Sequence, residues 1–405
     1  MSDRAPQVLL GVSGGIAAYK SAELLRRLTE SGHAVRVLPT TAALEFVGAA
    51  TFEALSGQPV ASGVFSDVPS VQHVRLGKEA DLVVVAPATA DLMARLAHGR
   101  SDDLLTAALL TARCPVLLAP AMHTEMWEHP ATRDNVALLR SRDTVVLEPA
   151  SGRLTGTDTG PGRLPDPAEI SEFGRLLLER ADALPRDLEG RRVVVSAGGT
   201  REPLDPVRYL GNRSSGRQGY AIARVAAQRG ARVTLVAGHT AELPDPAAVH
   251  VVHAPTAQRM QVAMHEASGD ADAVVMAAAV ADFRPVDLAD SKIKKGGAEP
   301  PPLRLTENPD ILAGLVRERP AGQVIVGFAA ETGDATGDAL HHGREKLHRK
   351  GCDLLLVNAV GDGKAFEVGE NAGWLLGADG GEQELPNGSK ALLASRVWDA
   401  DRARL

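Results

Sequence analysis

Short β-forming runs alternate with helical patterns along this chain, and the alternation begins twice. The apolar runs of the first series lie at residues 8–10, 34–38, 81–86, 115–119 and 144–147. Those of the second series lie at residues 192–195, 232–236, 249–253, 273–278, 323–327 and 353–357. Strands that alternate with helices form a parallel sheet covered by helices on both faces. The sequence therefore predicts an α/β protein with two doubly wound domains, residues 1–189 and 190–405.

Length, charge and cysteine content narrow the classes of protein that fit. At roughly 100–200 residues per domain, 405 residues predict two or three domains. The net charge of −7 argues against broad binding of nucleic acids, and two cysteines are too few for a disulfide framework. No apolar segment precedes the first strand, and the longest aliphatic stretch is shorter than the ~20 residues that span a bilayer. We expect a cytoplasmic protein that binds neither nucleic acid nor membrane.

A glycine-rich loop follows the first strand and opens the first helix. Because backbone N–H groups are unpaired at a helix N-terminus, this arrangement suits a phosphate group. The dinucleotide pattern fails, since Ser13 and Ile16 stand where its second and third glycines belong. A Walker A loop also fails, because Tyr19 replaces a required glycine. A monophosphate site made by Ser13, Gly14, Gly15 and Ile16 remains, which suits FMN; the alternative is an ordinary turn.

The ends of other predicted strands carry hydroxyl groups and small side chains. Ligands of parallel sheets bind at the carboxyl ends of the strands. At these ends the chain offers Thr40, Ala88, Thr89, Met122 and His123. We expect these residues to contact a flat ring and its polar atoms, with His73 as a candidate base. The Gly- and Thr-rich residues 150–167 are predicted to be an irregular lid, with a simple linker as the alternative.

A second candidate phosphate loop opens the second series of strands. It lacks the Walker lysine and the dinucleotide glycine spacing, but it carries glycines and hydroxyl groups ahead of a helix. Its candidate nucleotide ligands are Gly199, Thr200, Ser214, Ser215 and Gly216. Asp282, which follows a buried run, is a candidate ligand for Mg2+ that bridges nucleotide phosphates. Residues 291–297 form a basic loop, which in isolation would be a solvated surface.

Several of these segments together resemble known enzymes. Residues 11–20, 73–76, 86–91 and 120–127 are similar to flavin-dependent cysteine decarboxylases, and the second half resembles phosphopantothenate–cysteine ligase. In this order they resemble the bacterial bifunctional enzymes of coenzyme A synthesis over nearly the whole chain. The resemblance implies a flavodoxin-like flavoprotein domain that decarboxylates phosphopantothenoylcysteine with FMN. It also implies a Rossmann-like domain that joins 4′-phosphopantothenate to L-cysteine through an acyl-CMP intermediate made from CTP.

The resemblance assigns roles to single residues of the first half. In the family FMN accepts a hydride from the cysteinyl side chain, and His73 falls on the active-site histidine. The chain departs from the family at His123, where asparagine is usual, and at Gly156, which replaces a proton-donating cysteine. An imidazole can still donate a hydrogen bond to a carboxylate. Asp158, a threonine hydroxyl or a water must then supply the proton.

The second half carries residues that match the family's ligase positions. Asn212 falls on the catalytic asparagine, and Lys292 falls on a basic loop where it would neutralise charge during attack on the α-phosphate of CTP. The positions that align with nucleotide-binding segments are Asn308, Pro309, Asp310, Ile311, Phe328, Lys346 and Lys350. Lys346 and Lys350 would share one helix face, because they are four residues apart.

Family analogy also predicts assembly into trimeric decarboxylase units and dimeric ligase domains, up to a dodecamer. One alternative keeps the ligase but makes the first half a flavin-binding scaffold without catalysis. The missing flap cysteine favours that alternative, whereas His73 opposes it. A nicotinamide-dependent oxidoreductase is a further alternative, which the first glycine loop disfavours.

Overall fold

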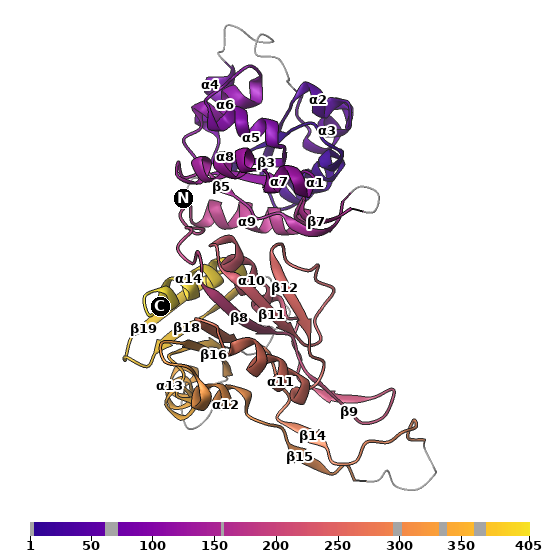
Figure 1. Cartoon of the computed structure of the whole chain (residues 1–405), viewed down its shortest axis with the longest axis vertical. Coiled ribbons are helices and arrows are strands. Elements are labelled where there is room, and N and C mark those ends of the chain that lie inside the picture. The colour runs from indigo at the N-terminus through magenta and orange to yellow at the C-terminus, as the bar shows by residue number, and fades with distance from the viewer. Residues whose placement is uncertain (1–3, 61–71, 155–157, 295–301, 332–337, 360–369) are drawn as a thin grey trace. The chain divides into compact units, whose positions relative to one another are not determined.

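The computed structural model describes residues 4–60, 72–154, 158–294, 302–331, 338–359 and 370–405 (Figure 1). The chain divides into two compact units, Met1–Leu184 with Pro246–Ala248, and Pro185–Asp245 with Val249–Leu405. Gly156 and the last residues of the predicted basic loop lie outside the described residues. Each unit has its own sheet and its own core, and each is described by itself below.

A five-stranded parallel sheet forms the centre of the first unit, in the order β2-β1-β3-β4-β5. This is the flavodoxin-like strand order, so the predicted class of the first domain is confirmed. Every residue of β3 is buried, as expected for a central strand between two helical layers. The strands are β1 Gln7–Val12, β2 Ala34–Pro39, β3 Leu82–Ala88, β4 Val116–Pro120 and β5 Val145–Val146.

Helices cover both faces of this sheet. One core cluster joins α4 (Gln72–Glu79), α5 (Ala90–Ala97), α6 (Leu104–Thr111) and α8 (Pro130–Arg140) to one face. On the other side α1 packs against α3 and α9, and α9 contacts β3. The remaining elements are η1 Ile16–Tyr19, α1 Lys20–Glu30, α2 Thr41–Leu44, α3 Ala49–Ser56, α7 Thr124–Glu128 and α9 Pro167–Glu179.

The segment predicted to be irregular contains an antiparallel hairpin. Strand β6 (Ala150–Arg153) pairs with β7 (Thr159–Arg163), outside the central sheet. The expectation of a wholly irregular segment is therefore wrong for these residues. Gly152, Gly160 and Gly162 have φ angles of 143°, 156° and 130°. Other residue types rarely adopt such angles, so the glycines that suggested a loop instead permit the backbone conformation of this hairpin.

An eight-stranded sheet forms the centre of the second unit, in the order β12-β11-β8-β13-β16-β17-β18-β19. Its first six strands are parallel and follow the Rossmann order, whereas β18 and β19 pair antiparallel at one edge. The six parallel strands match the predicted runs. The two edge strands were not predicted, because β19 is polar and contains a proline. The strands are β8 Arg192–Ala197, β11 Arg232–Ala237, β12 Val249–His253, β13 Ala273–Met276, β16 Val324–Glu331, β17 Leu354–Ala359, β18 Glu370–Gly377 and β19 Glu382–Ser389.

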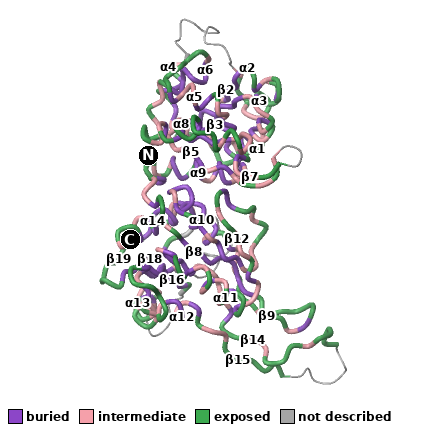
Figure 2. The backbone as a smooth tube through the Cα atoms, in the orientation of Figure 1, coloured by how far each residue is buried: buried purple, intermediate pink, exposed green. Residues whose placement is uncertain are grey.

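Two helical layers flank this second sheet. Helices α10 (Arg217–Gln228) and α14 (Lys390–Arg402) pack against each other, and α11, α12 and α13 share a core cluster with β8, β11, β13, β16 and β17. Figure 2 shows that exposed residues dominate the small ribbon of β14 and β15. The remaining elements are β9 Arg201–Pro203, β10 Tyr209–Gly211, β14 Phe283–Pro285, β15 Leu305–Glu307, α11 Ala257–Ser268, α12 Ile311–Glu318 and α13 Ala339–Lys350.

A buried arginine fixes the segment that leads into β8. The Arg229 guanidinium donates to both carboxylate oxygens of Asp187 at 2.8 and 2.6 Å, and to Asp399 at 2.9 Å. The backbone N–H of Leu188 also donates to the carbonyl of Arg229. Because a buried charge is costly unless it is paired, this double pairing holds residues 187–188 against α10 and α14.

None of the helices within the described parts of the chain has the length and apolar character needed to cross a membrane.

Candidate functional sites

A cleft of about 740 Å³ opens at the carboxyl edge of the first sheet. Its walls come from the turns after β1, β3 and β4 and from the β6–β7 hairpin. The volume falls within the range of cofactor and ligand sites. Six of the residues predicted from the sequence line this cleft: Gly14, Gly15, Ile16, Thr89, Met122 and His123.

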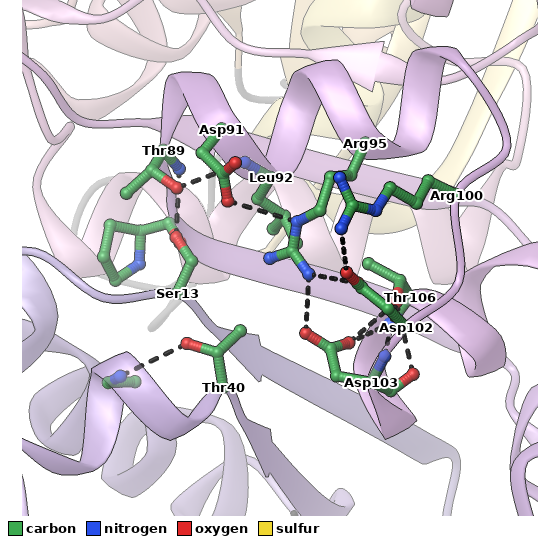
Figure 3. A network of polar contacts seen from close by, with 12 residues as sticks. Ser13, Thr40, Thr89, Asp91, Leu92, Arg95, Arg100, Asp102, Asp103 and Thr106 are labelled. Atoms are coloured by element: carbon green, nitrogen blue, oxygen red, sulfur yellow. Dashed lines mark hydrogen bonds and ion pairs between the residues drawn. The ribbon is translucent and has the colours of Figure 1, made fainter. Parts of the chain in front are cut away.

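The hydroxyl groups near this cleft are engaged with the backbone (Figure 3). The Ser13 hydroxyl donates to the carbonyl of Pro87 at 2.7 Å and accepts from the N–H of Thr89 at 3.0 Å. Ser13 is 1% exposed, and the side-chain oxygens of Thr40 and Thr89 cap α2 and α5. These hydroxyls therefore fix the turns that shape the cleft.

At Gly14 the glycine turn lies too close to Ala42 to allow a side chain. A Cβ atom on Gly14 would lie 2.4 Å from the Cβ of Ala42, whereas one on Gly15 would meet only a methyl group of Thr89 at 3.7 Å. Beside this turn the apolar side chains of Ile16 and Met126 line the cleft and remain exposed. The cleft thus combines a close backbone approach with apolar surface.

Three cations line the same cleft and were missed as site residues. They are Lys20, Arg153 and Arg163, and no carboxylate stands among the described lining residues. Burial, followed by the charge of Arg163, lowers the pKa of Lys20. Placing like charges together in a partly desolvated cleft favours an anionic ligand such as a phosphate. Lys20 belongs to the segment that fails the Walker A pattern. Arg163 is distant in sequence, and only the fold brings it close to Lys20.

The hairpin is fastened to the turn that carries His123. The Thr124 hydroxyl donates to the carbonyl of Pro161 at 2.8 Å, and the N–H of Met122 donates to the carbonyl of Gly162 at 2.9 Å. Asp158, just before β7, lies with a carboxylate oxygen 3.9 Å from Nδ1 of His123. Two of the predicted catalytic side chains are therefore adjacent, and both are accessible from solvent.

An ion-pair network supports the α5–α6 turn behind Thr89 (Figure 3). The Arg95 guanidinium reaches Asp91 at 3.1 Å, and Asp102 and Asp103 at 2.8 Å each. Arg95 is largely buried, and Asp103 also caps α6. Several charges joined in this way constrain a turn better than one exposed pair does. The network thus holds the helix whose first turn borders the cleft.

His73 lies apart from this cleft. It is half-buried on α4, and its carbonyl accepts a hydrogen bond from the Thr111 hydroxyl at 2.9 Å. It is not among the described residues that line the cleft. Ala88 is fully buried at the end of β3, where its carbonyl accepts from the N–H of Ala121. The side chain of His73 and the predicted flavin turn are therefore not brought together within one chain.

A smaller cleft of about 150 Å³ lies at the carboxyl ends of the central strands in the second unit. Among its walls are four predicted residues, Ser214, Ser215, Gly216 and Phe328. Gly216 begins α10 with a φ of 74°, and a Cβ there would lie 2.5 Å from a methyl group of Thr240. Asn358 and Lys390 also line this cleft, and the sequence analysis missed both.

Three predicted residues gather around the loop that follows β13. The Thr200 hydroxyl accepts from the N–H of Ala281 at 2.9 Å. The side-chain amides of Asn212 and Asn308 donate to the carbonyls at positions 280 and 281, at 3.0 and 2.8 Å. Asp282 follows directly and is exposed. β13 ends at Met276, so Asp282 stands on a loop held by these amides and not at the end of the strand.

Asp205 anchors the start of the basic loop. It accepts from the N–H of Ile293 at 3.1 Å and from the Arg208 guanidinium at 2.6 Å. Burial raises the pKa of this carboxyl, but the hydrogen bonds from Arg208 and from backbone N–H groups outweigh it, so the pKa is well below its usual range. Lys292 is exposed beside this anchor. Asp205, which the sequence analysis did not single out, therefore positions the backbone next to Lys292.

The remaining nucleotide-binding candidates lie on two neighbouring helices. Asp310 caps α12, and its carboxylate forms an ion pair with Lys350 of α13. Burial raises the pKa of Asp310, but the hydrogen bond from Lys350 brings it below the usual value. Pro309 and Ile311 flank Asp310 at the start of α12. Lys346 lies one turn before Lys350 on the same face of α13.

No group of three or more His, Cys, Asp or Glu side chains that could hold a metal ion occurs among the residues that the structure describes. Asp282 is therefore not part of such a group among the described residues. A site for Mg2+ at Asp282 would depend on oxygen ligands from a bound nucleotide.

The chain is thus a two-domain α/β protein. A flavodoxin-like domain is followed by a Rossmann-like domain, and each has a cleft at the carboxyl edge of its sheet. Residues 1–177 match the family model Flavoprotein, and residues 188–403 match the model of the DNA/pantothenate metabolism flavoprotein C-terminal domain. The chain is 67% identical over 399 residues to the coenzyme A biosynthesis bifunctional protein CoaBC of Mycobacterium tuberculosis strain H37Rv, covering 97% of this chain and 96% of that protein. It is 42% identical over 395 residues to the protein of the same name from Vibrio cholerae serotype O1, covering 96% of each.

Among solved structures, the FMN binding protein AtHal3 is 30% identical and matches 44% of this chain and 98% of its own, with a TM-score of 0.40. The full-length similarity shows that the chain belongs to the CoaBC family of bifunctional coenzyme A biosynthesis proteins. The predicted bifunctional enzyme, with decarboxylase and ligase activities, is thereby confirmed.

Proposed function

We propose that residues 1–189 carry out the FMN-dependent decarboxylation of phosphopantothenoylcysteine, and that residues 190–405 join 4′-phosphopantothenate to L-cysteine with CTP. The observation that carries this proposal is that each sheet has a cleft at its carboxyl edge, lined by residues expected for the reaction of that unit. Both reactions use small charged substrates, and we place the enzyme in the cytoplasm.

The residues of the first cleft fit FMN. Gly14 and Gly15 line the cleft at the start of the first helical segment, and Lys20 and Arg163 supply positive charge for a phosphate. Thr89 and Met122 line the wall where a flat ring would lie, with the buried Ala88 behind them. When bound, FMN would supply a reversible hydride acceptor, which takes a hydride from the cysteinyl side chain and gives it back after CO2 has left. That oxidation makes the adjacent carboxylate a good leaving group as CO2.

His73 requires a second copy of the chain in this mechanism. Within one chain it lies outside the lining of the cleft, so it can reach a substrate only if another subunit presents it. This supports trimeric decarboxylase units, in which each cleft borders a neighbouring chain. The exposed Ile16, Tyr19 and Met126 beside the cleft are surfaces that a neighbour would cover. Dimeric ligase domains would extend such trimers to a dodecamer.

His123 and Asp158 are proposed to handle the substrate carboxylate and the final proton. His123 would donate a hydrogen bond to the carboxylate before it leaves. Asp158 lies 3.9 Å from the His123 ring and is placed by a hairpin that borders the cleft. In the absence of the flap cysteine, a carboxylic acid there can protonate the carbon that CO2 has left. Thr155 and Thr157, the other candidates, lie outside the described residues.

The ligase residues are proposed to catalyse two steps, formation of an acyl-CMP and its reaction with cysteine. The carboxylate of phosphopantothenate attacks the α-phosphorus of CTP, and pyrophosphate leaves. Lys292 stabilises the negative charge that builds on the phosphorus oxygens. The amine of cysteine then attacks the acyl carbon, and CMP leaves. The Asn212 side-chain amide donates to the carbonyl of Val280, in the loop that also carries Asp282. This contact supports a role for Asn212 beside the acyl-CMP intermediate.

Product analysis tests this function against its alternative. The protein is incubated with 4′-phosphopantothenate, L-cysteine, CTP and Mg2+, and the products are identified by mass spectrometry. We expect 4′-phosphopantetheine, CMP, pyrophosphate and CO2, from a protein that purifies with yellow, non-covalent flavin. Accumulation of phosphopantothenoylcysteine would instead support a flavin-binding scaffold without catalysis, which the glycine at position 156 favours.

A further inference from the structure

The turn between β9 and β10 is joined to the basic loop of the ligase unit by one buried carboxylate. Asp205 lies in this turn, and its side chain has no exposed surface. Its oxygens accept from the backbone N–H groups of Val207 and Arg208 at 2.8 Å each, and from Nε and Nη2 of Arg208 at 2.9 and 2.6 Å. These bonds close the turn. A further bond, from the N–H of Ile293 at 3.1 Å, joins the turn to a segment 88 residues away.

The same ion pair holds Ile293 from its other side. Nη2 of Arg208 also donates to the carbonyl of Ile293 at 2.6 Å. Asp205 therefore fixes the peptide group before Ile293, which contains the carbonyl of Lys292, and Arg208 fixes the peptide group after it. Both peptide groups that border Ile293 are thus tied to one ion pair, so the backbone from which the Lys292 side chain extends is restrained.

Side-chain packing does little to hold the described part of this loop. Residues 291–294 are exposed and belong to no helix or strand, and Ile293 has 41% of its surface exposed. Just before them, the N–H of Ala289 donates to the carbonyl of Leu204 at 3.1 Å, which is again a contact with the β9–β10 turn. The position of the Lys292 backbone therefore depends on this turn, while the Lys292 side chain remains exposed.

We propose that Asp205 is a positioning residue for the first ligase step, and that it acts through Arg208 and the Ile293 peptide groups to set where Lys292 meets the α-phosphate of CTP. This inference rests on the role proposed above for Lys292. A cation stabilises developing charge best when it is already in place, because it then needs no rearrangement during the reaction. Loss of the ion pair should therefore slow formation of the acyl-CMP more than it weakens binding of CTP.

The first test measures acyl-CMP formation by the full-length enzyme without cysteine, by rapid quench with labelled CTP. Asp205→Asn keeps the size of the side chain but removes its charge. We expect the rate constant to fall about ten- to a hundredfold, with KM for CTP nearly unchanged. Asp287→Asn is the matched control, because it removes a carboxylate from an exposed ion pair with Arg304 beside the β14–β15 ribbon. The control should match the wild type.

A double variant separates positioning of Lys292 from a general structural role. Asp205→Asn is combined with Lys292→Gln, and the slow formation of acyl-CMP is followed over long incubations. If Asp205 acts through Lys292, its substitution has little effect once Lys292 is absent, so the two losses are not additive. An equal fold loss in both backgrounds would overturn the role of Asp205 and leave that of Lys292 standing. Formation of acyl-CMP at the wild-type rate by Lys292→Gln would overturn the role of Lys292 and this inference together.

Folding is checked separately, by the Tm of each variant and by decarboxylation of supplied phosphopantothenoylcysteine. Arg208→Lys carries the test if Asp205→Asn is unstable. It keeps a positive charge beside Asp205 but lacks the planar group that donates to Asp205 and Ile293 at once, so acyl-CMP formation should again slow. A folded Asp205→Asn or Arg208→Lys variant that forms acyl-CMP at the wild-type rate would contradict the proposal.

Discussion

The two clefts occupy equivalent positions on their sheets but are built from different groups. In the first unit the hydroxyls of Ser13 and Thr89 are hydrogen-bonded to the backbone, and cations line a cleft of about 740 Å³. In the second unit the cleft is about 150 Å³ and is lined by Ser214 and Ser215, of which Ser214 accepts a hydrogen bond from the N–H of Gly216 at 3.3 Å. Strand topology thus decides at which edge of the sheet a ligand binds. The loops and side chains at that edge decide which chemical groups face the ligand.

The clefts also differ in how completely one chain forms them. Asn212 and Asn308 are held around one loop in the second unit by hydrogen bonds to consecutive carbonyls. In the first unit His73 lies outside the cleft that it is proposed to serve. The loop site is assembled by hydrogen bonds within one chain, whereas we propose that a neighbouring chain completes the first cleft.

The largest effect is expected at His73. The variant His73→Asn keeps a polar side chain but cannot act as a base, so CO2 release should fall about a thousandfold. Flavin content and ligation should stay as in the wild type, because the ligase cleft is in the other unit. The measurement is CO2 release from supplied phosphopantothenoylcysteine. Decarboxylation at the wild-type rate would leave His73 with a structural role on α4 only.

The next largest effect is expected at Gly14, and it tests whether close packing of the glycine turn against Ala42 shapes the first cleft. In Gly14→Ala the new Cβ would meet the Cβ of Ala42 at 2.4 Å, so one backbone segment must move. We expect a loss of about 1–3 kcal/mol in the free energy of unfolding and a clear loss of bound flavin. Gly15→Ala is the matched control for stability, because its Cβ meets only a methyl group at 3.7 Å. Equal unfolding free energies for the two variants would contradict this account.

A buried carboxyl group outside the cleft makes the stability of the second unit depend on pH. Asp401 lies near the end of α14, and its carboxylate oxygens have no hydrogen-bond partner among the described residues. Burial, and next the charge of Asp353, raise the pKa of Asp401 to about 7, against the lowering effects of Arg404 and Arg229. The folded state therefore keeps a proton that the unfolded state has released. Stability falls as the pH rises from the unfolded pKa towards about 7, and levels off above it.

Asp401→Asn removes this titration. The free energy of unfolding of the variant, relative to that of the wild type, should increase by about 1–4 kcal/mol from pH 5 to pH 8. Urea unfolding followed by tryptophan fluorescence measures the difference at each pH. The KM values for the ligase substrates should not change, because Asp401 does not line the cleft. A difference between variant and wild type that is the same at both pH values would refute the buried titration.

The smallest effect is expected at Asp158. With Asp158→Asn, CO2 release should be nearly normal, but formation of phosphopantetheine should slow about tenfold, because the last proton lacks its donor. The unsaturated thiol product of decarboxylation should then accumulate, and mass spectrometry would detect it. If phosphopantetheine forms at the normal rate, the proton comes from a threonine hydroxyl or from water.

The sequence predicted those features that depend on local pattern. Apolar runs identified the parallel strands, and the glycine-containing loops ahead of α1 and α10 line the two clefts. The polar edge strand β19 has no such pattern, so it could not be predicted. Lys390 lies 172 positions from Gln218, and only the packing of α14 against α10 brings the two together. Lys20 and Arg163 meet for the same reason, through a hairpin that the sequence suggested only as a lid.

The central claim is that two independent active sites lie in two units of one chain, and a mixing experiment tests it most directly. His73→Asn and Lys292→Gln are each supplied with phosphopantothenate, cysteine and CTP, first alone and then mixed as separately purified proteins. We predict that His73→Asn accumulates phosphopantothenoylcysteine and that Lys292→Gln forms almost no product. The mixture should form phosphopantetheine, because the free intermediate made by one variant is decarboxylated by the other. A mixture that forms no phosphopantetheine, although Lys292→Gln decarboxylates supplied intermediate, would contradict independent sites.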